Sequence, residues 1–508
     1  MTNIFKVLFH RAFLFGAAIA IQVAVLIMMI YRFQQYFVIF YGISTLISMI
    51  VVILIANGRS KPGYKIAWII PIMLFPIFGG LFYLMFGGSR LGARTREKMN
   101  SITAKMADAL ASDSAIVNEI KQESTGAACQ SHYIQEYAYS PPFTNTYTEY
   151  LPSGEVKFER LIEELEKAEH FIFMEYFIIE EGIMWNTILD ILKRKAQAGV
   201  DVRIIYDDLG SIMKLPYQYD KQLEEMGIKC CIFNPFRPIL TLRFNNRDHR
   251  KIVVIDGHTG FTGGINLADE YINAIERFGH WKDTAIMIKG DAVYSLTVMF
   301  LAMWDYLRGV IEDYEQYKPK YYLKEKFPTD GYVQPFSDNP LDDESVGETV
   351  YLNLVSRAKE YIYICTPYLI IDIEMVSALC LAAKQGVDVR IITPHIPDKW
   401  YVHAVTRSNY DVLLEAGVRI YEYTPGFIHA KSFVVDDEYA VTGTINLDYR
   451  SLYLHFECGV WLYKTSSVMQ IKQDFIDIIK VSQEIQQEKL ILPRRVGRAL
   501  LNLFAPLM

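Results

Sequence analysis

Two segments of this 508-residue chain carry the same three polar residues in the spacing His-x-Lys-x4-Asp. They are His249, Lys251 and Asp256 in the first copy, and His429, Lys431 and Asp436 in the second. The residues that follow each lysine are mostly apolar and β-branched, which is typical of a strand. Because residues i and i+2 of a strand share one face, each histidine points to the same side as its lysine. Each copy therefore presents an imidazole beside an ammonium group.

An aspartate and a downstream asparagine complete each copy. Asp256 precedes Gly257, a pair that favours a hairpin turn, and Asp436 occupies the equivalent place in the second copy. We expect these aspartates to fix the turn, and direct chemistry is the less favoured of their two roles. Asn266 and Asn446 each end a Gly-x-x-Asn segment. In that position the side-chain amide can lie on the same face as the histidine and donate hydrogen bonds there.

A pocket lined by two imidazoles, two ammonium groups and two amides fits an oxyanion, and phosphate is the obvious one. One histidine can attack phosphorus while the other protonates the departing alkoxide, so the reaction would pass through a covalent phosphohistidine. The two lysines supply cationic stabilisation, so we expect no metal and no other cofactor. An attacking histidine needs an acceptor for its other ring nitrogen, and the candidates downstream of the two motifs are Asp283 and Glu457. The residues alone leave open which histidine attacks.

Both motifs belong to a longer internal repeat. The sequence AGVDVRII at residues 198–205 recurs as QGVDVRII at residues 385–392. A helical stretch and an apolar strand precede each of these segments, and the His-Lys motif follows each. This pattern predicts an α/β fold made of two domains related by a pseudo-two-fold axis. We place the first domain at residues 131–316 and the second at residues 346–508, with a linker at residues 317–345.

The first 90 residues predict a region of transmembrane helices. Three uncharged runs each reach the ~20 apolar residues that an α-helix needs to cross a bilayer. We place these spans at about residues 12–31, 36–56 and 66–86, and residues 91–130 form a linker to the first domain. A cleaved signal peptide is the alternative for the first run, but the apolar run continues beyond the small-residue site.

Orientation in the membrane is weakly determined by the sequence. Three spans would divide the flanking basic residues evenly between the two sides, so the positive-inside rule decides nothing. The six scattered cysteines favour a reducing compartment and therefore a cytoplasmic catalytic region.

Composition excludes several classes of protein. Hydrophobic residues make up 51% of the chain and charged residues 21%, so the chain is not intrinsically disordered. A formal net charge of −7 argues against a nucleic-acid partner, whose phosphates require a basic surface. The tail at residues 494–504 carries three arginines beside an apolar face, which suits a helix on an anionic bilayer. An ordinary packed helix would show the same pattern.

The two motifs resemble the twin HKD motifs of the phospholipase D superfamily. Residues 59–87 and 446–457 are similar to the corresponding segments of bacterial cardiolipin synthases, and the resemblance runs from about residue 33 to residue 508. It implies a multi-pass enzyme of the bacterial cell membrane that converts two phosphatidylglycerol molecules into cardiolipin and glycerol. It also implies that the six motif residues form the active site, with His249 as the nucleophile and His429 as the acid.

The sequence departs from the family pattern in two places. The run at residues 12–31 is extra relative to the common two-span arrangement, and Thr444 stands where many members have serine. Rival activities are a phospholipase D that uses water, a phosphatidyltransferase that uses another alcohol such as serine, and an endonuclease. The apolar N-terminal region favours the synthase, and together with the acidic charge balance it disfavours the endonuclease. Oligomeric state is not indicated by the sequence.

Overall fold

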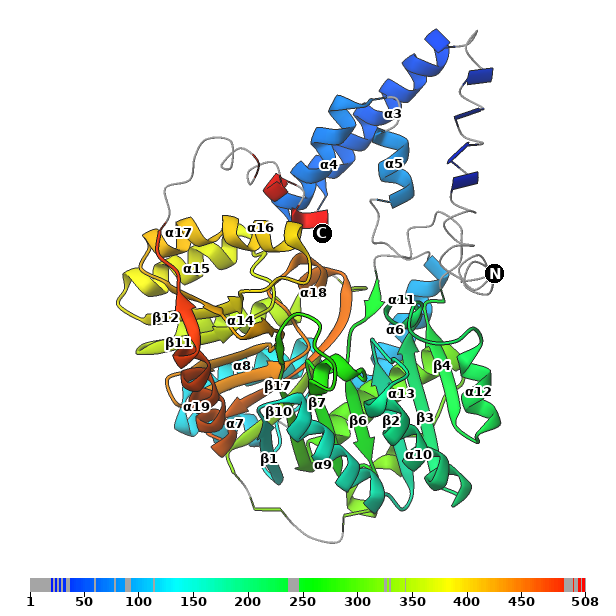
Figure 1. Ribbon diagram of the computed structural model, residues 1–508, viewed down its shortest axis with the longest axis vertical. Helices are drawn as coiled ribbons and strands as arrows, with labels where there is room; N and C mark the ends of the chain where they lie inside the picture. The colour runs from blue at the N-terminus through cyan, green and yellow to red at the C-terminus, as the bar shows by residue number, and fades with distance from the viewer. Residues whose placement is uncertain are drawn as a thin grey trace.

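The computed structural model describes residues 37–58, 61–76, 79–86, 93–112, 115–235, 246–323, 327–328, 330–342, 344–487, 501–503 and 505–507, with residue 497 and scattered positions between 20 and 32. Figure 1 shows a large α/β body from which the apolar helices α3, α4 and α5 project on one side. The body consists of two halves, each built on one sheet.

The first half contains a seven-stranded sheet in the order β1-β9-β7-β6-β2-β3-β4. Strands β2, β3 and β4 run parallel to one another, and the other pairs are antiparallel. Every residue of β2 is buried, as expected at the centre of a sheet that helices cover on both faces. The strands are β1 (Thr146–Leu151), β2 (Phe171–Tyr176), β3 (Asp201–Asp207), β4 (Lys229–Phe233), β6 (Ile252–Ile255), β7 (Thr259–Gly263) and β9 (Ala285–Gly290). The helices are α9 (Gly154–Lys167), α10 (Ile183–Gln197), α11 (Asp208–Ser211), α12 (Tyr219–Glu225) and α13 (Val293–Arg308).

The second half repeats this arrangement in the order β10-β17-β16-β15-β11-β12-β13-β18. Its parallel strands β11, β12 and β13 correspond to β2, β3 and β4, and its antiparallel strands β15, β16 and β17 correspond to β6, β7 and β9. The strands are β10 (Tyr332–Asp338), β11 (Tyr361–Cys365), β12 (Asp388–Pro394), β13 (Arg419–Tyr423), β15 (Ser432–Val435), β16 (Tyr439–Gly443), β17 (His455–Tyr463) and β18 (Ser482–Glu484). The helices are α14 (Val346–Arg357), α15 (Ile373–Lys384), α16 (Trp400–Ser408), α17 (Tyr410–Glu415), α18 (Tyr449–Tyr453) and α19 (Ser466–Lys480). The predicted duplication of an α/β unit is therefore confirmed.

One hydrophobic core joins the two halves. Val254 and Ile286 of the first sheet belong to the same buried cluster as Val434 and Val460 of the second. Thr262 Oγ1 lies 3.3 Å from Cys458 Sγ across this junction. Two further cores lie on the outer faces, one in each half. Because the central core draws on both sheets, the halves are packed as one body.

The segments that the sequence assigned to linkers contain regular structure. Within residues 91–137 lie α6 (Ala93–Ala109), α7 (Ala115–Glu123) and α8 (Thr125–Tyr137). Buried residues of α7 and α8 belong to the outer core of the second half. Within residues 317–345, β10 is an ordered strand that pairs with β17. Packing against the second half gives these segments the apolar burial that a linker lacks.

The N-terminal region contains one helix long and apolar enough to cross a membrane among the described residues, at Val38–Asn57. It is α3 (Phe37–Asn57), which matches the predicted span at residues 36–56. The predicted span at residues 12–31 lies mostly outside the described residues. The predicted span at residues 66–86 is wrong as one continuous helix, because this run is divided between α4 (Pro62–Leu74) and α5 (Gly79–Phe86).

Helices α4 and α5 form an antiparallel hairpin. Trp68 of α4 packs edge-on against Tyr83 of α5, with ring centroids 5.2 Å apart. Nearer the turn, a Cβ on Gly79 would lie 2.4 Å from Ile72 Cα, so only glycine permits this approach. Ser48 Oγ of α3 donates a hydrogen bond to Pro76 O at the turn. Figure 1 shows both helices beside α3 at its end nearer the body. At 1.5 Å per residue, α4 extends about 20 Å, less than the ~30 Å of a hydrocarbon core.

A lysine between α3 and α4 attaches the hairpin to the second half. Lys61 Nζ lies 2.9 Å from Glu348 Oε1 and 2.9 Å from Asp372 Oδ2. The hydroxyl of Tyr453, on α18, lies within hydrogen-bond distance of the same two carboxylates, at 2.7 and 3.0 Å. The end of α3 that carries Asn57 therefore lies against the catalytic body.

Candidate active site

Two short strand pairs that cross between the halves bring the histidines together. β5 (Arg247–Asp248) of the first half pairs in parallel with the start of β17, and β14 (Gly426–Ile428) of the second half pairs in parallel with β8 (His280–Lys282). The N–H of His249 then donates to Phe456 O at 2.9 Å, and the N–H of His429 donates to Lys282 O at 2.7 Å. Each histidine is therefore positioned by the main chain of the opposite half.

Each imidazole is held by a carboxylate from the other half. His249 Nδ1 lies 2.9 and 3.0 Å from the two oxygens of Glu457. His429 Nδ1 lies 2.6 Å from Asp283 Oδ2. Thr444 Oγ1 also donates to Glu457. The sequence identified both carboxylates as candidates but associated each with the motif that precedes it, and the structure pairs them across the halves instead.

Burial determines the charge of the two imidazoles. Desolvation lowers the pKa of His249 to about 3, although the charge of Glu457 opposes this shift. Desolvation also lowers the pKa of His429 to about 4, and the nearby ammonium of Lys431 adds to the effect. Both rings are therefore neutral at neutral pH, and a Nδ1 proton shared with the carboxylate leaves a lone pair on Nε2.

The two lysines lie directly beside the histidines. Lys251 Nζ donates to His249 O at 2.5 Å, and Lys431 Nζ donates to His429 O and lies 2.8 Å from His429 Nδ1. Both side chains are almost completely buried. Desolvation lowers the pKa of Lys251 to about 8 and that of Lys431 to about 7. A phosphate anion in the site would favour the charged form of both.

The two aspartates of the motifs lie at the ends of strands. The carboxylate of Asp256 accepts hydrogen bonds from the N–H groups of Glu169, His170 and Phe171, each at 2.8 Å. Asp436 does the same at the start of β11, at 2.7 to 2.9 Å. Both residues have positive φ, 47° and 51°, as the turn after each strand requires. These hydrogen bonds support the turn-fixing role that the sequence favours for both aspartates, and a direct action on substrate stays a prediction.

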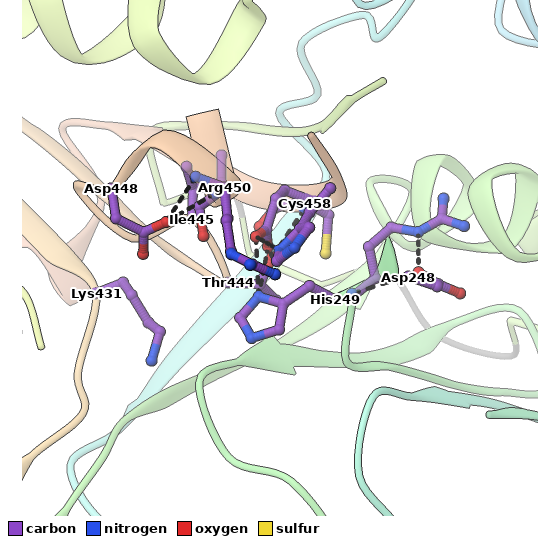
Figure 2. A network of polar contacts seen from close by, with 12 residues as sticks. Asp248, His249, Lys431, Thr444, Ile445, Asp448, Arg450 and Cys458 are labelled. Atoms are coloured by element: carbon purple, nitrogen blue, oxygen red, sulfur yellow. Dashed lines mark hydrogen bonds and ion pairs between the residues drawn. The ribbon is translucent and has the colours of Figure 1, made fainter. Parts of the chain in front are cut away.

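A cavity of about 650 Å³ lies between the halves and is lined by both histidines, Asn266 and Asn446. Asn266 Oδ1 accepts from Ile178 N–H at 3.0 Å, and its Nδ2 donates to Tyr271 Oη at 2.7 Å. Asn446 Oδ1 is buried and has no hydrogen-bond partner among the described residues. Figure 2 shows His249 of the first half near Lys431 and Arg450 of the second. The predicted histidines and asparagines therefore share one cavity.

Several cavity residues were not predicted from the sequence, and Arg450 and His455 are among them. His455 lies two residues before Glu457, so alignment of the two repeats around the carboxylates would have revealed it. His249, His455 and Glu457 also place one potential metal ligand each within 4.8 Å of one another. A metal ion bound there would compete with the Nδ1 proton of His249 for Glu457.

A duplicated α/β fold with two carboxylate-held histidines in one cavity defines an enzyme of phosphodiester chemistry. The family model described as cardiolipin synthase, PLD-like domain, matches residues 161–304 and 351–479, and a phospholipase D-nuclease N-terminal model matches residues 45–88. The chain belongs to the cardiolipin synthase family of the phospholipase D superfamily.

Individual proteins agree with this assignment. An uncharacterized protein of Streptococcus mutans is 45% identical over 90% of this chain and 99% of its own length. A cardiolipin synthase of Alkalihalophilus pseudofirmus is 36% identical over 87% of this chain and 88% of its own length. A phosphatidylserine synthase structure from Haemophilus influenzae is similar in fold, with a TM-score of 0.55 and 16% identity, over 71% of this chain and 95% of that protein.

Proposed function

We propose that this enzyme transfers the phosphatidyl group of one phosphatidylglycerol to a second, giving cardiolipin and glycerol. The observation that carries the proposal is the pair of buried imidazoles, each held by a carboxylate of the opposite half and facing one cavity. Membership of the cardiolipin synthase family supports phosphatidylglycerol as the substrate.

In the first step, His249 Nε2 attacks phosphorus while the bond from phosphorus to the headgroup oxygen breaks. Glu457 accepts a hydrogen bond from the Nδ1–H of His249 and stabilises the positive charge that develops on the ring, while the proton stays on Nδ1. The phosphate anion of the bound lipid raises the pKa of His429 and favours its protonated form. His429 then gives its proton to the leaving glycerol, and a phosphatidyl group remains on His249.

In the second step, His429 is neutral and accepts the proton of a glycerol hydroxyl on a second phosphatidylglycerol. That oxygen forms a bond to phosphorus as the bond to His249 breaks, which releases cardiolipin. Asp283 stabilises the imidazolium of His429 in both steps. Lys251 and Lys431 offset the negative charge of the phosphoryl oxygens, so neither step requires a metal ion.

Labelled phosphatidylglycerol in detergent–lipid micelles should yield cardiolipin and glycerol in equal amounts, without nucleotide and with a chelator present. The reason is that one covalent intermediate is formed and passed to a second lipid hydroxyl. Chromatography of the lipids and of released glycerol measures both products. Phosphatidic acid as the main product would favour a phospholipase D, and an absolute need for CDP-diacylglycerol or serine would favour a different transferase.

We further propose that α3 and the run at residues 12–31 span the membrane, that α4 and α5 enter only part of it, and that the catalytic body lies in the cytoplasm. Because α5 turns back, its end and the Asn57 end of α3 are on the same side. The basic residues Arg59, Lys61, Lys65, Arg90, Arg94, Arg96 and Lys98 then flank that side, against Arg32 at the other end of α3. This asymmetry favours a cytoplasmic body. The arginine-rich tail would lie on the same anionic leaflet.

A membrane-impermeant maleimide tests this topology in spheroplasts. Cys129 is exposed on α8, Asn57 ends α3, and Tyr31 lies beyond the other end of α3. We expect Cys129, and Asn57→Cys in a Cys129→Ser background, to react only after permeabilisation, whereas Tyr31→Cys in that background reacts without it. The Cys129→Ser protein measures background labelling, because Cys380 is partly exposed and remains in it. If only one of the two, Asn57→Cys or Cys129, reacted before permeabilisation, they would lie on opposite sides of the membrane. That result would indicate a third full span between them.

A further inference from the structure

The pseudo-two-fold symmetry of the active site is broken at one matched position. His455 pairs with Arg247 where β17 meets β5, two residues before Glu457. Trp281 pairs with Phe427 where β8 meets β14, two residues before Asp283. Each of these residues approaches the histidine of the opposite motif at the same distance, since the ring centroids of His249 and His455 and those of His429 and Trp281 are both 5.6 Å apart.

The surroundings of the two catalytic histidines therefore differ in chemistry. The ring of His429 is approached by the aromatic rings of Trp281, Phe427 and Tyr271, at 5.6 to 5.8 Å between centroids. The ring of His249 is approached by Phe177 on one side and by the imidazole of His455 on the other. Trp281 Nε1 is buried without a hydrogen-bond partner among the described residues, as are both ring nitrogens of His455, so each half offers one such ring to the cavity. The two rings differ in kind, because an indole has a single N–H donor whereas an imidazole has two ring nitrogens.

The imidazole of His455 has no hydrogen-bond partner among the described residues. Both of its ring nitrogens are buried without a hydrogen bond, and the side chain is 10% exposed. Nδ1 approaches Glu457 Oε1 to 3.7 Å, beyond hydrogen-bond distance. Because an unsatisfied buried polar group costs free energy, the orphan ring at the wall of the cavity indicates a ligand group in the catalytic cycle.

We propose that His455 binds a non-bridging phosphoryl oxygen of the substrate, and that it stabilises the phosphatidyl group while that group is attached to His249. This inference rests on the proposed phosphatidyl transfer. An imidazole can carry a proton on Nε2, and a hydrogen bond from that N–H to an anionic phosphoryl oxygen would satisfy the buried ring. A second imidazole lies beside His249 where an indole lies beside His429, and this difference favours His249 as the residue that carries the covalent intermediate. His455 is a substrate-binding residue in addition to the two motif histidines.

Tungstate binding tests the proposal without turnover. The probe is the tungstate anion, a mimic of phosphate, titrated into the full-length protein in detergent. We expect His455→Phe to weaken tungstate binding about tenfold or more, because one charge-assisted hydrogen bond is lost. His455→Gln keeps an N–H donor and should retain most of the affinity. Trp281→Phe, at the matched position of the other half, removes the indole N–H and should weaken tungstate binding clearly less than His455→Phe does.

Cardiolipin synthesis and adduct formation complete the test. His455→Phe should lower kcat/KM about 10- to 100-fold and slow phosphorylation of His249, with His455→Gln between it and the unaltered enzyme. Thermal melting of each variant identifies misfolding, and His455→Gln remains informative if His455→Phe does not fold. Unchanged tungstate affinity in both His455 variants, or equal loss in Trp281→Phe, would overturn the inference. Absence of cardiolipin from the unaltered protein would instead count against the proposed function.

Discussion

His429→Ala should accumulate a phosphatidyl group on His249 when it is given a lipid phosphodiester with a p-nitrophenyl leaving group. That leaving group departs without a proton, so the first step proceeds without His429. The second step fails, because no base remains to activate the incoming hydroxyl. His249→Ala should form no adduct with the same substrate. With phosphatidylglycerol, either substitution should reduce turnover by about 10³-fold or more, since the two histidines act as a unit.

Acid-sensitive phosphohistidine requires a gentle readout. Digestion at neutral to alkaline pH after a rapid quench, followed by mass spectrometry, locates the adduct on a peptide containing His249 or His429. Thermal melting checks that both variants are folded, because each alanine leaves a buried carboxylate, Glu457 or Asp283, without its imidazole partner. An adduct on His429 in the His249→Ala protein would reverse the two roles. The absence of an adduct in both variants would contradict the covalent mechanism.

Glu457→Gln and Asp283→Asn should slow different steps of the reaction, because each carboxylate holds a different histidine. Glu457 holds Nδ1 of His249 at 2.9 Å, and Asp283 holds Nδ1 of His429 at 2.6 Å. An amide of the same shape stabilises the developing imidazolium much less than a carboxylate does. We expect each substitution to lower cardiolipin synthesis by about 10² to 10⁴-fold, by analogy with other carboxylate–histidine pairs.

The p-nitrophenyl substrate distinguishes the two carboxylate variants. Glu457→Gln should slow release of p-nitrophenol, because its partner His249 is the nucleophile. Asp283→Asn should release the first equivalent at nearly the normal rate and then stall, as His429→Ala does. Glu457→Asp is a matched control that keeps the charge and shortens the reach to His249. If Asp283→Asn slowed the first step and Glu457→Gln did not, each carboxylate would be serving the motif of its own half.

The repeat and the residues of the chemistry were accessible from the sequence. The His-x-Lys pairs are local, because a strand places residues i and i+2 on one face whatever surrounds it. The duplicated α/β unit was equally accessible, since both copies keep the same order of segments. The preference of Asp256 and Asp436 for a structural role also came from local turn chemistry, and the structure places both carboxylates on the backbone of neighbouring strands.

The N-terminal region shows where local information ends. Hydropathy gives the length of an apolar run, but it does not show whether that run forms one helix or two helices joined by a turn. Residues 66–86 have the composition of a span, yet Gly79 packs on Ile72 and the chain turns back. Contacts with Ser48 of α3 stabilise this turn, and they arise only when the helices pack together. The tertiary structure therefore shows that this run is divided between two helices, which a count of apolar residues does not reveal.

By itself, the sequence determined the fold class, the twin motifs and the family. The tertiary structure alone decided which carboxylate serves which histidine and that His455 faces His249. These pairings depend on β5 meeting β17 and β8 meeting β14, which join residues far apart in the chain. A motif records the spacing of neighbours along one strand, whereas the partner of each ring is set by how two sheets pack across a shared core. Distances across that core depend on how the two halves pack, and this packing cannot be deduced from any single segment of the sequence.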